Sequence, residues 1–313
     1  MNPPLVAVYM ITYNHENYIA QAIDSVLTQK TTFPIKIFIG EDCSTDQTAA
    51  ICLKYKEENK EIIEVILNKQ NIGQSNNAKQ IYEASLSSGA KYIAILEGDD
   101  YWTDPYKLQK QVDFLEANPE YGMVHTGANI VNSQNGLILI SNDPKPKGDV
   151  FADLLKRAFI ITTTVCIRAD IIRALTTRVE KENLWYTIDY WTWAHCAMQS
   201  KVHFIQETTS SYRSHEFNIT KNKGYFFQKR LPLIVLDIVA VRLAQDNPVS
   251  LSLAFLLSVN YNAAMLARRV AFKEKKKFLK LIAKHPWLLF GFIPSIIRKI
   301  SNRIKHSGVG KFR

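Results

Sequence analysis

Cysteine is scarce in this sequence of 313 residues, and its four copies are widely separated. They stand at positions 43, 52, 166 and 196, and no two of them form a C-x-x-C pair. This pattern argues against a disulfide framework and against a thiolate metal site. It is typical of a protein that works in a reducing compartment.

Long apolar runs are also missing. The best candidates, LSLAFLLSV and WLLFGFI, have about half of the roughly 18 residues that a membrane-spanning helix needs. The first residues, MNPPLVAVYMITYNHE, have no basic stretch ahead of the apolar one, so we expect no signal peptide. Together with the cysteine pattern, these features predict a cytoplasmic protein.

No glycine-rich phosphate loop is present either. The sequence contains neither the Walker A pattern G-x-x-x-x-G-K-[ST] nor the pattern G-x-G-x-x-G. A phosphate-containing ligand would therefore have to be held in another way, for example through a bound cation.

Acidic residues become rare toward the end of the chain. Residues 1–224 contain 22 basic and 26 acidic residues, whereas residues 225–313 contain 17 basic and only 3 acidic ones. A slightly acidic body is thus followed by a strongly basic tail, and we expect two regions with different tasks, 1–224 and 225–313.

Within the body, apolar runs alternate with stretches of helical periodicity. Strands are expected at residues 5–12, 35–39, 64–68 and 91–96, and helices at residues 17–29, 44–58 and 75–87 and after Asp104. Ser44 opens a capping-box pattern, and Asp104-Pro105 resembles an N-cap followed by the first helical residue. The alternation predicts an α/β fold with a doubly wound, mostly parallel sheet between helices.

Polar clusters follow three of these strands. They are Thr12-Tyr13-Asn14, Glu41-Asp42 and the run from Glu97 to Asp100 in ILEGDDYWTDP. Ligands of open α/β sheets bind beyond the carboxyl ends of the strands, so these clusters mark the candidate site. Neighbouring carboxylates without cysteine suit a hard divalent cation, Mn²⁺ or Mg²⁺, which in turn holds a diphosphate.

Four motifs together resemble the family 2 glycosyltransferases of the GT-A (Rossmann-like) fold. They are TYN after the first strand, ED-x-S-x-D-x-T after the second, N-x-G at 71–73 and EGDDYW-x-DP-x-KL-x-KQ after the fourth. The resemblance covers about residues 5–220. It implies that Asp42 contacts the base of a nucleotide-sugar donor, Asp99 its ribose and Asp100 the metal. The other donor-binding residues that it implies are Thr12, Tyr13, Asn14, Glu41 and Asn77. Glu97 and Glu41 stand where the family usually has aspartate.

The resemblance also assigns a catalytic base, Asp189, in the segment WYTIDYWTWAHCA. The family carries an acid before this position, where this chain has Ile188. Aromatic residues surround Asp189 in the sequence, and an apolar wall raises the pKa of a carboxylate and makes it a better base. The alternative is that the aromatics belong to the core and that Asp189 caps a helix.

A last match, SYRSH at 211–215, resembles the pattern Y-R-x-H of the family. It implies that Arg213 pairs with the diphosphate and that His215 completes the metal shell or contacts the leaving phosphate. The other six histidines lie outside any such pattern.

The basic tail interleaves lysine and arginine with large apolar residues, which is typical of an amphipathic segment on an anionic membrane. Two alternatives remain open. Binding of nucleic acid fits the charge, but no recognition motif is present, so none is expected. The tail could also be a solvated face that packs on the catalytic domain. The pattern Q-x-x-R-W of processive synthases is absent, which favours transfer of single sugars.

These observations predict an inverting, metal-dependent glycosyltransferase at the inner face of the cell membrane. The resemblance implies a UDP-linked donor and a saccharide or lipid-linked saccharide acceptor in the synthesis of a surface polysaccharide such as lipopolysaccharide. A sugar nucleotidyltransferase is the alternative enzyme, but the glycine- and lysine-rich loop expected of it after the first strand is missing. An inactive saccharide-binding protein at the membrane is the alternative outside enzymes.

Overall fold

The computed structural model describes residues 3–182, 188–215, 231–245, 249–265 and 279–291. The chain divides into two compact units. Unit 1 consists of Met1–Val150 and Phe159–His215, and unit 2 of Phe151–Ala158 and Glu216–Arg313. The boundary predicted at residue 224 lies outside the described residues and stays a prediction.

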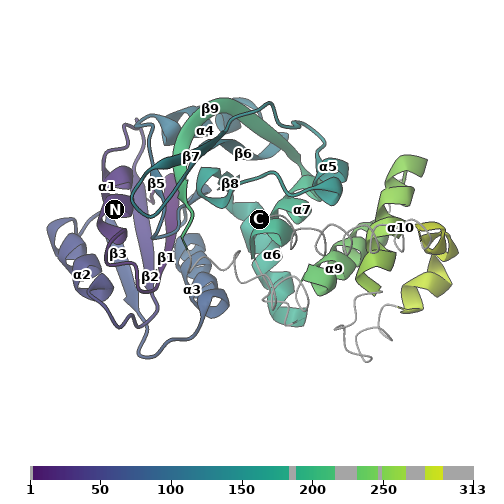
Figure 1. Ribbon diagram of the computed structural model, residues 1–313, viewed down its shortest axis with the longest axis horizontal. Helices are drawn as coiled ribbons and strands as arrows, with labels where there is room; N and C mark the ends of the chain where they lie inside the picture. The colour runs from purple at the N-terminus through teal and green to yellow at the C-terminus, as the bar shows by residue number, and fades with distance from the viewer. Residues whose placement is uncertain (1–2, 183–187, 216–230, 246–248, 266–278, 292–313) are drawn as a thin grey trace, which may run out of the picture. The chain divides into compact units, whose positions relative to one another are not determined.

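Unit 1 alternates strands and helices, as the periodicity predicts (Figure 1). Its strands are β1 (Val6–Thr12), β2 (Ile35–Glu41), β3 (Ile63–Leu67), β4 (Tyr92–Ile95), β5 (Tyr101–Trp102), β6 (Tyr121–Val131), β7 (Leu137–Ser141), β8 (Cys166–Arg168) and β9 (Lys201–Arg213). Its helices are α1 (Ile19–Leu27), α2 (Thr48–Glu58), α3 (Gln74–Ser87), α4 (Lys107–Ala117), η1 (Thr162–Thr164), α6 (Ala169–Glu182) and α7 (Ile188–Gln199).

The strands form one mixed sheet in the order β3-β2-β1-β4-β8-β6-β9-β5, and β7 pairs with β6 beside this path. The first four strands of this order are parallel to one another. Beyond β4 the sheet changes, because β8 runs antiparallel to both β4 and β6. The predicted α/β architecture with flanking helices is confirmed, and antiparallel pairs make its second half mixed.

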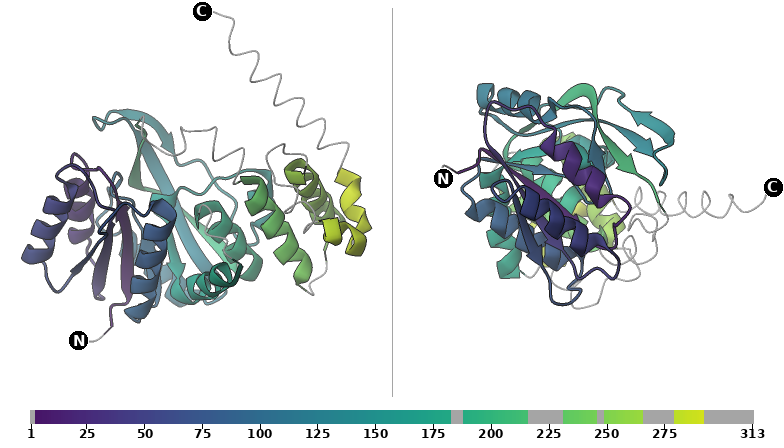
Figure 2. Two further views of the ribbon diagram at one scale, coloured as in Figure 1. Left: turned by 90° about the horizontal axis from the view of Figure 1, so that it is seen from below. Right: turned by 90° about the vertical axis from the view of Figure 1, so that its left-hand side faces the viewer.

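Helices cover both faces of the parallel half of the sheet (Figure 2). Because side chains alternate along a strand, Met10 of β1 joins a core cluster with Ile23 of α1 and Cys52 of α2. Its neighbour Tyr9 faces the other way and stacks on Tyr82 of α3, with ring centroids 4.5 Å apart. All five side chains are buried, so a fully apolar strand is what this position requires.

The parallel register brings the predicted polar clusters to one edge of the sheet. Thr12, the last residue of β1, pairs with Glu41, the last residue of β2. After β4, the backbone runs on beside β1, where the N–H of Gly98 donates to the carbonyl of Ile11. Residues 97–100 therefore lie next to the ends of β1 and β2.

Two of the predicted helix starts are wrong by a few residues. Helix α2 begins at Thr48 and not at Ser44, whose hydroxyl instead accepts the N–H of Asn14. Helix α4 begins at Lys107, and the carboxylate of Asp104 accepts the N–H of Tyr106 ahead of the helix. At Asp104 a local side-chain bond thus holds a turn where the sequence pattern predicted a helical cap, whereas Ser44 bonds to a loop thirty residues away in the chain.

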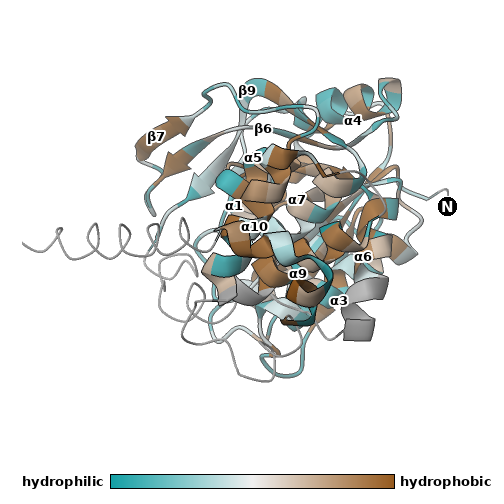
Figure 3. Cartoon of the chain, turned by 90° about the vertical axis from the view of Figure 1, so that its right-hand side faces the viewer, coloured by the Kyte–Doolittle hydropathy of each residue, from teal (hydrophilic) through white to brown (hydrophobic). Residues whose placement is uncertain are grey.

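Unit 2 is helical in its described parts, with α5 (Phe151–Lys156), α9 (Leu231–Ala244), α10 (Leu251–Met265) and η4 (Pro286–Gly291). Helices α9 and α10 are apolar over most of their length (Figure 3). Their buried side chains include Ile234, Leu236, Ile238, Leu257 and Tyr261. Among the residues described, no helix has both the length and the apolar character that a membrane crossing needs.

Candidate active site

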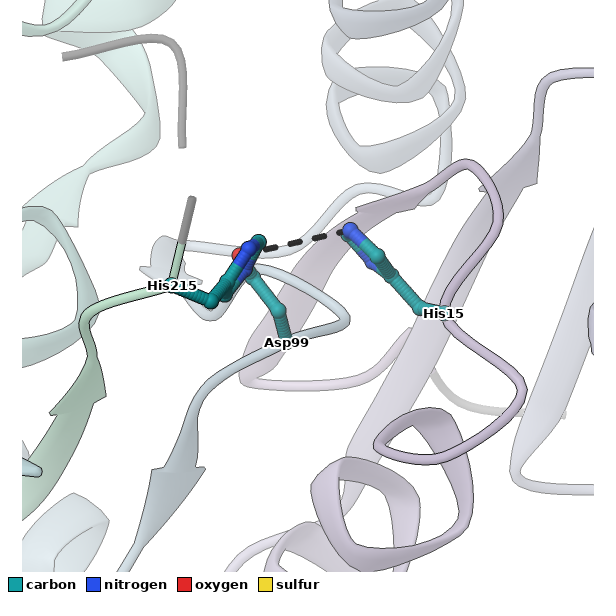
Figure 4. A group of neighbouring side chains, drawn as sticks. All are labelled: His15, Asp99 and His215. Carbon is teal, nitrogen blue, oxygen red and sulfur yellow. Dashed lines mark hydrogen bonds and ion pairs between the residues drawn. The ribbon is translucent and has the colours of Figure 1, made fainter. Parts of the chain in front are cut away.

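Two histidines flank the carboxylate of Asp99 (Figure 4). The Nε2 atom of His215 lies 2.9 Å from Oδ2 of Asp99, and Nε2 of His15 lies 4.0 Å from the same oxygen. His15 follows β1, Asp99 follows β4 and His215 follows β9. The fold thus joins three loops at one carboxylate oxygen.

Asp99 also belongs to a second cluster, with Glu97 and Asp100, whose carboxylate oxygens lie within 4.8 Å of one another. Asp100 is fully buried, and its Oδ1 accepts the N–H of Arg213 at 2.8 Å. Burial, followed by the charges of Asp99 and Glu97, raises the pKa of Asp100 well above its usual range. Neighbouring carboxylates of this kind need a cation for all of them to be ionised.

Both clusters fit a divalent metal ion. The group His15, Asp99 and His215 offers two imidazole nitrogens and a carboxylate, a set that suits Mn²⁺ better than Mg²⁺. The group Glu97, Asp99 and Asp100 offers oxygen atoms only, which suit either ion. Within the described part of the chain, Oδ2 of Asp100 is buried without a hydrogen-bond partner, as a ligand atom without its ion would be. Asp99 is common to both groups.

His15 was not expected at the site. Its ring atom Nδ1 lies 3.2 Å from Oγ1 of Thr12, and its backbone N–H donates to Oγ1 of Thr48 at 2.8 Å. Burial lowers the pKa of His15, and the nearby Asp99 only partly opposes this. The sequence prediction dismissed His15 because no motif contains it, whereas the contact with Asp99 depends on the fold.

Gly98 explains how these loops approach so closely. A Cβ atom at this position would lie 2.7 Å from Oγ1 of Thr12 and 3.1 Å from Nδ1 of His15. Any larger residue would push the loop that carries Asp99 away from the end of β1.

Arg213 lies beneath this cluster and is 1 % exposed. Its guanidinium donates to the carbonyl oxygen of Asp99 and to Gln21 and Asn135, and it lies over the ring of Tyr18 at 4.4 Å. This buried setting favours a positioning role for Arg213. Direct pairing with a diphosphate, as predicted from the sequence, would require the side chain to leave these partners.

Asp42 is the central residue of the second predicted cluster. Its carboxylate accepts hydrogen bonds from the N–H groups of Ile72 and Gly73 at 2.9 Å and from Asn68 at 3.0 Å. Asp42 is only 2 % exposed. Its hydrogen bonds to Ile72 and Gly73 fix the loop that contains the N-x-G motif at 71–73. Contact between Asp42 and a nucleotide base stays a prediction.

The loops after β1 and β2 are interlocked. Oδ1 of Asn14 accepts the N–H of Thr45, and the carboxylates of Glu16 and Asp46 each accept an N–H from the opposite loop. Asn14 adopts a left-handed backbone, with φ of 53°. The side chain of Tyr13 is 41 % exposed and free of these bonds, so it is the residue of this loop best placed for a ligand.

Two further predicted donor-binding residues have internal partners. Oε1 of Glu41 accepts the N–H of Ser44 at 2.8 Å. Asn77 is buried, donates to the carbonyl of Gly40 at 2.8 Å and accepts from Asn68 at 3.3 Å. We therefore interpret Glu41 and Asn77 as residues that support the loops of the site, and their contact with a donor stays a prediction.

Asp189 lies in the first turn of α7 and is half-buried. The hydroxyl of Thr162 donates to its Oδ2 at 2.8 Å. Burial raises the pKa of Asp189, and the hydrogen bond from Thr162 partly offsets this. Burial and then the charges of Asp189 and Asp99 raise the pKa of Glu97 well above its usual range. Glu97 therefore lies within electrostatic reach of both Asp189 and the metal-ligand candidates.

The aromatic residues near Asp189 have different settings. Trp191 and Trp193 are 6 % and 2 % exposed, so they belong to the core, as the alternative interpretation holds. Tyr190 is half-buried, and Trp185 and Tyr186 lie outside the described residues. Two of the aromatics that surround Asp189 in the sequence are thus core residues, and the role of Asp189 as the base stays a prediction.

A sequence model described as Glycosyl transferase family 2 matches residues 7–176, more than half of the chain. This chain belongs to glycosyl transferase family 2. The match contains all but the first residue of β1, the strands β2 to β4, and the acidic residues Glu41, Asp42 and Glu97 to Asp100.

Curated relatives match a large part of the chain. An uncharacterized protein of Mycobacterium tuberculosis (strain H37Rv) is 32 % identical over 219 residues, which are 68 % of this glycosyltransferase and 60 % of the relative. TuaG of Bacillus subtilis (strain 168), named for teichuronic acid biosynthesis, is 28 % identical over 221 residues, 70 % of this chain and 83 % of TuaG. The family 2 glycosyltransferase described here therefore spans about 60 % of the length of the mycobacterial relative.

Solved structures share its fold. TarS of S. aureus in complex with UDP-GlcNAc has a TM-score of 0.62 at 15 % identity, covering 89 % of this chain and 80 % of the other. The mannosyltransferase PcManGT from Pyrobaculum calidifontis, in complex with GDP-Man and Mn²⁺, has a TM-score of 0.53 at 14 % identity, covering 96 % and 88 %. At these identities the likeness confirms the GT-A fold of this glycosyltransferase.

Proposed function

We propose that this family 2 glycosyltransferase moves a single sugar, with inversion, from a UDP-linked donor to a saccharide or lipid-linked saccharide in the synthesis of a surface polysaccharide. The observation that carries the proposal is that the carboxylates of Asp99, which follows β4, and of Asp189, in the first turn of α7, both lie close enough to Glu97 to raise its pKa. The UDP-GlcNAc complex of TarS and the name of TuaG support the choice of donor and pathway class.

Asp189 is the general base of this reaction. Its raised pKa brings the carboxylate closer to the range in which it takes a proton from an acceptor hydroxyl at neutral pH. Thr162 holds Oδ2 by its hydrogen bond and so orients the carboxylate. The acceptor oxygen then attacks the anomeric carbon on the face opposite the departing nucleotide, which inverts the configuration.

Asp99 and His215 hold the metal ion in this proposal, because their ligand atoms meet at 2.9 Å at the edge of the sheet. When bound, the metal supplies Lewis-acid stabilisation of the departing diphosphate. Asp100 was predicted as a ligand from the sequence. Its Oδ1 accepts the N–H of Arg213, which leaves Oδ2 for a ligand role.

Unit 2 supplies the contact with an anionic membrane in this proposal, from the cytoplasmic side. Gly291 lies against the backbone of Ser258 and Val259, so η4 packs on α10. Large apolar side chains remain exposed on these two elements, with Leu251 at 92 % and Phe290 at 78 %. Lys280, Lys284 and the net charge of the tail favour an anionic lipid surface as their partner.

The test is turnover of nucleotide sugars by the purified full-length protein. We expect Mn²⁺-dependent release of UDP from one UDP-sugar, and binding of that donor that raises Tm. Asp99→Asn should abolish both effects, whereas Glu207→Gln, which removes an exposed ion pair with Lys110, should leave them unchanged. Binding of the donor without turnover in the presence of any saccharide or lipid-linked acceptor would favour the inactive binding protein instead.

A further inference from the structure

His15 is a residue of the site that no sequence motif contains, and three contacts define its position. Its backbone N–H donates to the hydroxyl of Thr48, and its ring atom Nδ1 lies beside the hydroxyl of Thr12. Its other ring nitrogen, Nε2, faces Asp99 (Figure 4). The loop after β1 that carries His15 is also held in place by Asn14, which forms hydrogen bonds with Ser44 and Thr45.

We propose that His15 is a direct metal ligand and that the metal centre of this enzyme is the three-residue group His15, Asp99 and His215. The proposal rests on the proposed function for the presence of a metal ion. What it adds is a second imidazole, from the loop after β1.

The distances are compatible with one shared ion. Ligand atoms that bind the same ion at about 2.1 Å can lie at most about 4.2 Å apart. The two Nε2 atoms lie 2.9 Å and 4.0 Å from Oδ2 of Asp99, and all three ligand atoms are within 4.8 Å of one another. Side-chain movements of well under about 1 Å would complete the group, and such movements are ordinary for loops in proteins.

His15 faces Asp99 without a hydrogen bond to it. At 4.0 Å, the pair His15 Nε2 and Asp99 Oδ2 is too long for a hydrogen bond. His215 already holds that oxygen at 2.9 Å. Both imidazoles thus direct Nε2 toward the same carboxylate oxygen. This is the arrangement of side chains that bind one cation.

Thr12 provides the outer contact that metal-binding histidines usually have. When Nδ1–H of His15 donates to Oγ1 of Thr12, the lone pair of Nε2 is directed toward Asp99. Gly98 leaves room for this arrangement, because a Cβ atom there would lie 3.1 Å from Nδ1 of His15. The predicted donor-binding residue Thr12 thereby acquires a role in orienting the metal ligand.

The donor set has a consequence for metal choice. Two neutral imidazoles and one carboxylate favour Mn²⁺, and borderline ions in general, over Mg²⁺, which prefers oxygen ligands. We therefore expect Mn²⁺ to bind the protein in the absence of nucleotide, and to bind at least about tenfold more tightly than Mg²⁺.

The test uses Mn²⁺ alone with the full-length protein. Loss of the free Mn²⁺ signal in electron paramagnetic resonance measures binding, and electron spin-echo modulation reports imidazole nitrogens bonded to the ion. We expect two such nitrogens in the wild type, one in His15→Ala, and at least about a tenfold weaker affinity for Mn²⁺ in that variant. His285→Ala, which removes a histidine of unit 2, is the matched control and should keep both properties.

Thermal unfolding of each variant confirms that it is folded, and His15→Asn, which keeps a polar side chain, provides a second variant if His15→Ala is unstable. The proposal is overturned if both His15 variants bind Mn²⁺ as tightly as the wild type while Asp99→Asn does not. If Asp99→Asn also binds normally, no part of this group holds the ion, yet donor turnover by the wild type would still uphold the proposed function.

Discussion

The hydroxyl of Thr162 donates a 2.8 Å hydrogen bond to Oδ2 of Asp189. The two residues come from η1 and from the first turn of α7, which are separated in the chain by β8 and α6. The bond holds the carboxylate of Asp189 in one orientation and lowers the pKa that burial has raised. Position and proton affinity of the proposed base are therefore both set by the tertiary structure.

Replacing Asp189 tests the base itself. Asp189→Asn keeps the size of the side chain but cannot take a proton, so kcat should fall by about 10²–10⁴-fold while the Kd for UDP and Mn²⁺ stays nearly the same. Glu207→Gln is the control. Turnover within a few fold of the wild type would remove Asp189 from the mechanism, and a lost donor affinity would make it a binding residue.

Replacing Thr162 tests the pH dependence. A base is active when deprotonated, so activity is lost as the pH falls through its pKa. Thr162→Val removes the hydrogen bond that lowers the pKa of Asp189, so the acidic limb of the kcat/KM profile should move to higher pH. Thr176→Val, at an exposed hydroxyl on α6, should leave the limb in place. A limb that moves to lower pH, or not at all, would contradict this role.

Arg213 should contribute mainly to stability and to the shape of the site. Arg213→Lys keeps the charge but cannot reach Asp99, Gln21 and Asn135 at once, and we expect a loss of about 1–3 kcal/mol in the free energy of unfolding. Urea unfolding measures this loss. An unchanged stability together with a lost affinity for UDP would restore the prediction that Arg213 binds the diphosphate.

The buried side chain of Lys107 should make the stability of the folded protein depend on pH. Its ammonium group is fully buried, bonded to Gln111 and lies over the ring of Trp102, and burial lowers its pKa to about 7. An unfolded lysine has a pKa of about 10.4, so between these values the unfolded chain binds a proton that the folded chain lacks. This group therefore makes the folded protein more stable as the pH rises from about 7 to about 10.

Lys107→Met should remove this contribution to the rise of the free energy of unfolding with pH. Urea unfolding of wild type and variant at pH 7 and pH 9.5 gives two differences in the free energy of unfolding. The wild type should gain on the variant at the higher pH, since all other groups titrate alike in both proteins. Equal differences at the two pH values would show that Lys107 stays charged in the folded state.

Membrane binding by unit 2 can be tested in the full-length protein. Lys280→Gln and Lys284→Gln should each weaken binding to anionic liposomes by about fivefold, corresponding to about 1 kcal/mol per basic residue near the surface. Phe290→Ser should weaken it further, because its side chain is 78 % exposed. Leu137→Ser changes an equally apolar exposed residue in unit 1 and is the control. Sedimentation of all variants like the wild type would remove this surface from the proposal.

Local patterns in the sequence were enough for the parallel half of the sheet of unit 1, but not for its mixed half from β5 to β9. Runs of apolar residues predicted β1 to β4, since a strand buried on both faces must be apolar throughout. The same patterns placed Thr12, Glu41 and Asp99 at strand ends, and parallel pairing then requires them to share an edge. The starts of α2 and α4 were missed, because Ser44 bonds to Asn14 in another loop and Asp104 bonds to Tyr106 in a turn ahead of the helix.

The chemistry at Asp99 and Asp189 was decided by contacts between residues far apart in the chain. Among the seven histidines of the sequence a motif marks His215 but not His15, and only the packing of the loops after β1 and β9 brings both to one carboxylate. Burial decided that Arg213 supports the backbone of Asp99 and that Trp191 and Trp193 belong to the core. Strand periodicity is a short-range property and can be read along the chain, whereas burial and ligand geometry exist only once distant segments have packed.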